Sequence, residues 1–145
     1  MTMVNISEPL RNAIVSSSNI TMLLDTYKGS YPVFTHRPVP NDAPDISIVI
    51  SQDISGDHQD GVNFFRPVIV RDIMIYGPNN SPPDIYRKVK EIARLIHSLF
   101  HRRKDLQVPG WHTLNVTCTG PLEIPLEDQS VTAAVTVTVT LARKQ

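Results

Sequence analysis

Hydrophobic and polar residues alternate most regularly near the C-terminal end of the chain. In residues 130–142, apolar side chains occupy one side of an extended chain and the other side is mainly threonine. This pattern predicts a strand with one buried face and one half-polar face, which suits solvent or a wet interface with another subunit. The buried side would consist of Val131, Ala133, Val135, Val137, Val139 and Leu141.

Three further segments have the composition of strands. Residues 45–51 alternate isoleucine with smaller residues, and residues 111–119 form a third strand along the chain. Residues 64–76 are apolar on both sides apart from Arg71 and Asp72, so we expect both faces of this strand to be covered.

Glycine and proline separate these segments. Residues 77–80 (Gly-Pro-Asn-Asn) predict a turn, and Gly120-Pro121 followed by Pro125 predicts the end of the third strand. The proline-rich residues 31–44 predict an ordered connection laid over the surface, because each proline favours an extended conformation in the residue before it.

The clearest helical period lies in residues 81–101. Ser81 is placed to cap this helix and Pro82 to occupy its first position. Two shorter helices are predicted over residues 8–16, with Ser7 as the N-cap, and over residues 19–25. The apolar stripe of the long helix comprises Ile85, Val89, Ile92, Ala93, Ile96, Leu99 and Phe100.

The order of these elements predicts an α+β fold. We expect one domain over residues 1–145, with a mixed, mainly antiparallel sheet of about four strands. The long helix would pack on one face of that sheet, and one or two short N-terminal helices would precede it.

Composition limits the class of protein. Hydrophobic residues make up 41% of the 145 residues, which is enough for one core, and a single cysteine excludes an internal disulfide framework. The sequence contains no apolar run long enough for a membrane span, and residues 1–12 lack the pattern of a signal peptide. With 14 basic and 14 acidic residues the net charge is zero, which argues against a dedicated nucleic-acid binder.

The zero net charge is a cancellation between two regions. Residues 87–104 hold seven basic residues and one acid, and residues 42–60 hold five aspartates and no Lys or Arg. Three interpretations are open. Both regions could be ordinary solvated surfaces, the basic helix could contact nucleic acid, or the two regions could meet between copies of the chain. A nucleic-acid contact would normally include interleaved exposed aromatic residues and glycines, which this basic face lacks. The candidate residues of an interface with another subunit or a tube are Asp53, Asp57, Asp60, Arg87, Arg94 and Arg102.

Candidate catalytic residues are few. The sequence contains no nucleophile elbow, no phosphate-binding loop and no dinucleotide-binding glycine motif. Cys118, alone within a strand, is typical of a small buried hydrophobic residue. His97 and His101 have the spacing of zinc ligands on a helix, but no glutamate base lies between them and no third ligand is evident. We therefore expect no catalytic, cofactor-binding or metal site.

A succession of short segments resembles a known family. These are residues 9–14 (PLRNAI), 43–50 (APDISIVI), 71–78 (RDIMIYGP), 82–93 (PPDIYRKVKEIA) and the Gly-Pro pair at 120–121. In this order, and over nearly the whole chain, they resemble the tail terminator, or tail completion, proteins of long-tailed bacteriophages.

The resemblance implies a structural role without enzymatic activity, metal or cofactor. Such proteins form a hexameric ring on the head-proximal end of the tail tube, end its polymerisation and offer a joining surface to the neck. The implied partners are other copies of the chain, the tail tube protein and a neck or head-completion protein, and DNA passes through the ring without sequence-specific binding. The implied location is the tail–neck junction of the virion, after assembly in the host cytoplasm, with no membrane involved.

Three other functions remain open from the sequence. The nearest alternative is a neck or head-completion protein of the same virion. More distant alternatives are a small α+β enzyme, which would need a pocket with converging polar groups, and a nucleic-acid-binding module that uses the basic helix.

The polar residues 52–61 form a longer connection than a simple hairpin needs, and we expect it to contact the tail tube or a neighbouring subunit. Deletion of residues 55–60 is therefore expected to leave a folded protein that no longer caps tubes. Circular dichroism would check the fold, and electron microscopy would check tail length. Normal tail length and normal head joining in the deletion mutant would contradict this prediction.

Overall fold

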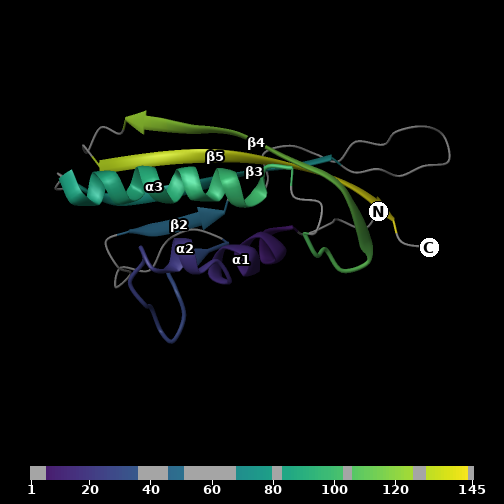
Figure 1. The fold of residues 1–145 in the computed structure, drawn as a ribbon, viewed down its shortest axis with the longest axis horizontal. Helices are drawn as coiled ribbons and strands as arrows, with labels where there is room; N and C mark the ends of the chain where they lie inside the picture. Colours follow the sequence, from purple (N-terminus) through teal and green to yellow (C-terminus); the bar gives the residue numbers. More distant parts are fainter. Residues whose placement is uncertain are drawn as a thin grey trace.

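The computed structural model describes residues 6–35, 46–50, 68–79, 83–102, 106–125 and 130–143 (Figure 1). The predicted α+β fold is confirmed, with five strands in place of about four. The helices are α1 (Ser7–Val15), α2 (Ser18–Thr21) and α3 (Pro83–Phe100), and the strands are β1 (Val33–Phe34), β2 (Ser47–Ile50), β3 (Val68–Asn79), β4 (Trp111–Pro125) and β5 (Ser130–Arg143).

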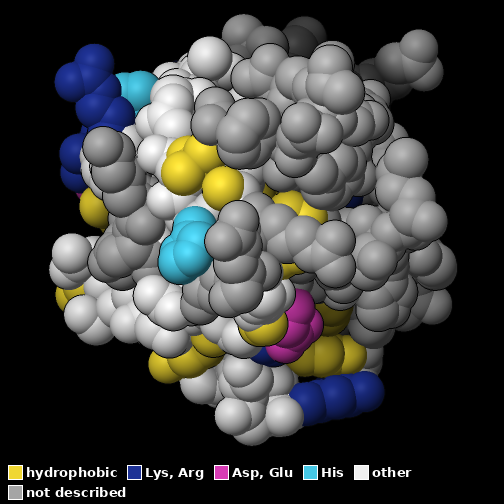
Figure 2. Space-filling model, turned by 90° about the vertical axis from the view of Figure 1, so that its right-hand side faces the viewer, with side chains coloured by type: hydrophobic (Ala, Val, Ile, Leu, Met, Phe, Trp, Pro, Cys, Tyr) yellow, Lys and Arg dark blue, Asp and Glu magenta, His cyan; other side chains and the backbone are white. Residues whose placement is uncertain are grey.

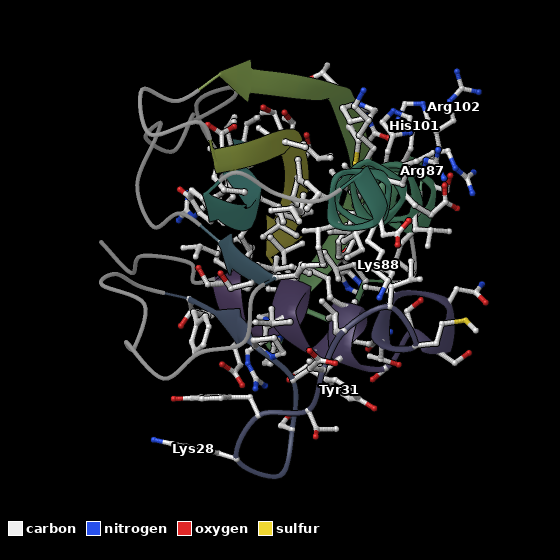
Figure 3. The ribbon with its side chains drawn as sticks, turned by 90° about the vertical axis from the view of Figure 1, so that its left-hand side faces the viewer. Lys28, Tyr31, Arg87, Lys88, His101 and Arg102 are labelled. Carbon is white, nitrogen blue, oxygen red and sulfur yellow. The ribbon has the colours of Figure 1, made fainter. Side chains whose placement is uncertain are left out.

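The strands form one sheet in the order β1-β2-β3-β5-β4. Only β1 and β2 run parallel to each other, and all the other neighbouring strands are antiparallel, so the sheet is mixed and mainly antiparallel as predicted. In Figure 1, α3 lies along the sheet beside β5 and β3, and α1 and α2 lie below it near β2. The end view in Figure 3 shows α3 beside the sheet, with the two short helices below it.

The alternation in β5 decides which face of the sheet carries the core. Val135, Val137 and Val139 are fully buried, and their register neighbours on β3 include Ile73 and Ile69. Burying a side chain of this size contributes about 1.5–3 kcal/mol relative to leaving it exposed. The predicted stripe of α3 belongs to the same core, where its fully buried members are Val89, Ile92, Ala93, Ile96 and Phe100.

Strand β4 is longer than the sequence predicts. Gly120-Pro121 and Pro125 were expected to end it, but the strand continues through Pro125. A register shift between Thr119 and Leu122 accommodates the Gly-Pro pair. Strand β4 is at the edge of the sheet, so only one of its two sides pairs with another strand. A proline whose backbone nitrogen points away from β5 therefore costs no hydrogen bond between the strands.

Strand β3 differs from prediction in two respects. Residues 77–79 belong to the strand instead of the predicted turn, because β5 begins at Ser130 and pairs with Asn79 after a register shift. Both faces were expected to be covered, yet the side chains at even positions 68–76 are half-exposed and those at odd positions 69–75 are buried. The predicted start of this strand, at residues 64–67, lies outside the described residues.

The N-terminal region also departs from prediction. Ser7 is the first helical residue of α1, with Ile6 at the cap position, and α2 covers only Ser18–Thr21. Within the expected surface connection, Val33 and Phe34 form β1, and Val33 is buried opposite Ile48 of β2. The predicted cap of α3, Ser81 with Pro82, and residues 36–44 of the connection lie outside the described residues.

The second face of β5 carries the predicted threonines. Thr136, Thr138 and Thr140 are half-exposed, and Thr136 Oγ1 donates a hydrogen bond to Asp72 Oδ1 at 2.6 Å. Thr132 is fully buried, and within the described part of the chain its Oγ1 has no hydrogen-bond partner. The hydroxyl of Thr136 therefore stabilises the fold through its hydrogen bond, whereas the buried hydroxyl of Thr132 destabilises it.

Replacing these two threonines by valine should shift stability in opposite directions. Thr132→Val removes a buried hydroxyl without a partner, so we expect the free energy of unfolding to rise by about 1 kcal/mol. Thr136→Val removes a hydrogen bond to a carboxylate, so we expect it to fall by about 1 kcal/mol. Urea denaturation of both variants checks the pair, and a loss of stability in Thr132→Val would contradict the assigned role of its hydroxyl.

Candidate assembly surface

The basic residues of α3 lie on two sides of the helix. Arg87, Arg94 and His101 are seven residues apart, which places them along one side. In Figure 3, His101 and Arg102 lie above and to the right of α3 and Arg87 lies to its right, whereas Lys88 lies below the helix, on the side of α1 and α2. Arg87, Lys88, Arg94 and Arg102 are all exposed to solvent. We call Arg87, Arg94 and Arg102 the basic flank.

Two hydrogen bonds fix the end of α3 to the edge strand β4. The Arg102 N–H donates to the Val116 carbonyl oxygen at 2.6 Å, and the Cys118 N–H donates to His101 Nδ1 at 3.1 Å. Arg102 has a φ of 62°, the left-handed conformation in which many helices end. These contacts hold the side of α3 that carries the basic flank over the β4 edge of the sheet.

Arg94 makes an ion pair within its own helix. Its Nε donates to Glu91 Oε2 at 3.1 Å, and Nη2 donates to Glu91 Oε1. The hydrogen bond from Arg94 lowers the pKa of Glu91, and the same interaction raises the pKa of Arg94. Because both side chains are well exposed, solvent screens this pair and it contributes little to stability. Its effect is to hold the Arg94 guanidinium at the helix surface.

The acidic candidates Asp53, Asp57 and Asp60 lie outside the described residues. The described chain reaches Ile50, the last residue of β2, immediately before that acidic segment. Strands β2 and β4 are separated by β3 and β5, which places them roughly 14 Å apart at ordinary strand spacing. The C-terminal end of β2 and the basic flank therefore lie on opposite sides of the central strands β3 and β5.

The two helical histidines form a stacked pair. The rings of His97 and His101 are 4.9 Å apart at their centroids and inclined by 22°. His101 Nδ1 accepts the hydrogen bond from Cys118, so this nitrogen already has a structural partner. The described residues contain no group of three or more His, Cys, Asp and Glu side chains that could hold a metal ion.

Cys118 is a buried part of the core. The residue is 5% exposed, and its backbone N–H donates the hydrogen bond to His101 Nδ1. Burial raises the pKa of the Cys118 thiol to about 11, so it is protonated at neutral pH. A protonated, buried thiol is a poor nucleophile, which agrees with the hydrophobic role predicted from the sequence.

One exposed feature was not predicted from the sequence. Residues 27–30 form a tight turn, in which Lys28 and Gly29 have φ values of 48° and 81°. Tyr27 and Ser30 exchange two backbone hydrogen bonds of 2.7 and 2.9 Å. Positive φ at both central positions identifies a type I′ turn. Such a turn is usually predicted from Asn-Gly, and Lys-Gly is a less common sequence for it. Figure 3 shows Lys28 projecting away from the helices.

Figure 2 views the end of the molecule opposite that of Figure 3, and its hydrophobic side chains occur in small separate groups. The large hydrophobic side chains that are exposed in the described residues are Met22 and Leu114. None of the described helices is both long enough and apolar enough to cross a membrane.

Comparisons with known proteins show similarity at the level of fold. No profile of a known family matches the chain, and no curated protein sequence matches it. Among solved structures, the chain is similar to a protein in the virion of a native gene transfer agent particle, with a TM-score of 0.72 and 9% identity over 94% of each chain. A second structure, whose name describes no function, has a TM-score of 0.51 and 13% identity over 95% of this chain and 96% of that chain. The chain therefore shares its fold with a virion protein along almost its whole length.

The environment of Cys118 predicts a thiol that reacts slowly in the folded protein. Burial raises the pKa of the thiol from 9.0 to about 11, so the folded protein favours the protonated form. The free energy of unfolding is therefore unaffected by this thiol at neutral pH and falls as the pH rises from about 9 to about 11. Labelling with a thiol reagent at pH 8 should be at least tenfold slower in the native than in the urea-unfolded chain. Equal rates in the two states would contradict the buried role of Cys118.

Proposed function

We propose that the chain is a structural virion protein that forms a ring on the head-proximal end of a phage tail tube. The ring ends polymerisation of the tube and presents a joining surface to the neck. The observation that carries this proposal is the fold shared with a protein of a gene transfer agent virion over 94% of both chains. The succession of sequence segments that resembles tail terminators supports the same role independently.

The distribution of charge along the sequence agrees with a protein that assembles with copies of itself. A ring requires two different surfaces on each subunit, because each copy contacts the next one head to tail. The basic flank supplies one charged surface at the β4 edge, and the acidic segment that follows β2 supplies a second one in the sequence. We propose six subunits per ring, with the tail tube protein and a neck protein as its partners and DNA passing through without sequence-specific contacts.

Catalysis is less well supported by the same residues. The thiol of Cys118 is protonated and buried, and Nδ1 of His101 is engaged by a backbone N–H. Neither side chain is therefore arranged as a nucleophile or a general base in the described structure.

A neck or head-completion protein is the second candidate, because a shared fold with a virion protein fits that role as well. The two roles differ in what happens when the protein is missing. A terminator limits tube growth, whereas a head-completion protein retains DNA in a head that then joins a normal tail.

Deletion of the coding sequence from its virus is expected to give overlong tails, measured by electron microscopy of lysates. Supplying the wild-type chain from a plasmid should restore uniform tail length and serves as the control. Tails of normal length together with heads that leak DNA would overturn the terminator role and support the second candidate.

A further inference from the structure

Strand β4 forms an edge of the sheet that its own side chains do little to protect. It pairs with β5 on one side only, and residues 111–119 contain no Lys, Arg, Asp, Glu or Pro. An uncharged edge strand offers its backbone N–H and C=O groups to a strand of another molecule. Natural proteins usually block such an edge with charges, prolines, bulges or a covering segment.

Two register shifts confine regular pairing in the middle of β4 to a short stretch. They lie between Thr113 and Asn115 and between Thr119 and Leu122, so residues 115–119 are in continuous register with β5. Along an antiparallel strand, successive residues direct their backbone groups alternately toward the partner and away from it. Residues 116 and 118 are bonded by the end of α3, so their backbone groups are the ones that point away from β5.

The end of α3 bonds these outward groups in the pattern of a neighbouring strand. The Arg102 N–H donates to the Val116 carbonyl oxygen at 2.6 Å, and His101 Nδ1 accepts from the Cys118 N–H at 3.1 Å. An antiparallel strand would supply one donor and one acceptor to the same two groups. Arg102 makes its bond at a φ of 62°, a conformation that residues other than glycine seldom adopt. We call His101 and Arg102 the plug.

The opposite edge of the sheet is also bonded by a helical residue. Strand β1 has only two residues, and Nε of Arg11 in α1 donates to the Val33 carbonyl oxygen at 3.0 Å. A very short edge strand offers little backbone to another molecule. Helical residues therefore bond the strand backbone at both edges of the sheet.

We propose that the plug keeps two copies of the chain from pairing through β4. The covered edge fits the β4 of a second copy that runs antiparallel to it. A twofold axis at Thr117 places Val116 of each copy opposite Cys118 of the other, which satisfies every backbone group that the plug would release. The inference goes beyond the proposed function and does not rest on it, because it concerns a contact that the native chain avoids.

Opening the plug in the full chain tests its bond to β4. His101→Ala removes the acceptor of the Cys118 N–H, so we expect this amide to exchange with solvent at least tenfold faster, measured by NMR. His101→Asn should restore protection, because the side-chain oxygen of asparagine is also an acceptor. His97→Ala removes the other ring of the stacked pair and is the matched control, which should exchange like the wild type.

A disulfide between copies detects pairing through β4. Thr117 is half-exposed, and in the proposed pair its two Cα atoms lie roughly 4.5 Å apart, within the range of a disulfide. The reporter chain carries Thr117→Cys and Cys118→Ala. It should cross-link under oxidising conditions when His101→Ala and Arg102→Pro are added, because proline has no N–H for Val116. With the plug intact it should not cross-link.

The outcomes decide the proposal without measuring tails. Unchanged exchange of the Cys118 amide in His101→Ala, or no cross-link in a folded reporter with the plug opened, would overturn it. Cross-linking of the reporter with the plug intact would overturn it as well, and this result does not depend on whether the opened variant folds. Circular dichroism checks the fold of each variant. Failure here leaves the proposed function standing, since tail length tests that function separately.

Discussion

The packing of α3 against β5 fixes the direction in which every charged side chain of the helix points. Ile92, Ile96 and Phe100 are fully buried in the same core as Val135 and Val137, so the helix cannot rotate without exposing them. Truncating one such side chain to alanine typically costs about 2–5 kcal/mol, which shows how strongly this arrangement is held. The orientation of the basic flank is therefore a consequence of the core and not of the charges themselves.

Regular patterns in the sequence were sufficient to predict the central elements. The twofold period of β5 and the helical period of α3 arise from burial on one side, and burial acts locally along each element. The course of β4 beyond Gly120-Pro121 and that of β3 to Asn79 depend on pairing with β5, a partner that is distant in sequence. The two-residue strand β1 likewise forms because it pairs with β2. Its own sequence is too short to predict a strand.

The candidate surface could be predicted only in part. The sequence places Arg87, Arg94 and Arg102 in one basic region, but it does not separate them from Lys88. That separation follows from the rotation of α3 and from the bonds that join His101 and Arg102 to β4. Asp53, Asp57 and Asp60 lie outside the described residues, so their role in the interface remains a prediction from charge.

The central claim is that the chain sits at one end of a tail tube. Electron microscopy of tails assembled with a gold-labelled chain tests this claim most directly, because the position of the label along each tube is read from single particles. The account predicts one cluster of label at a single end of each tube, at the junction with the head when heads are present. Label distributed along the tube, or bound to heads and never to tubes, would contradict it.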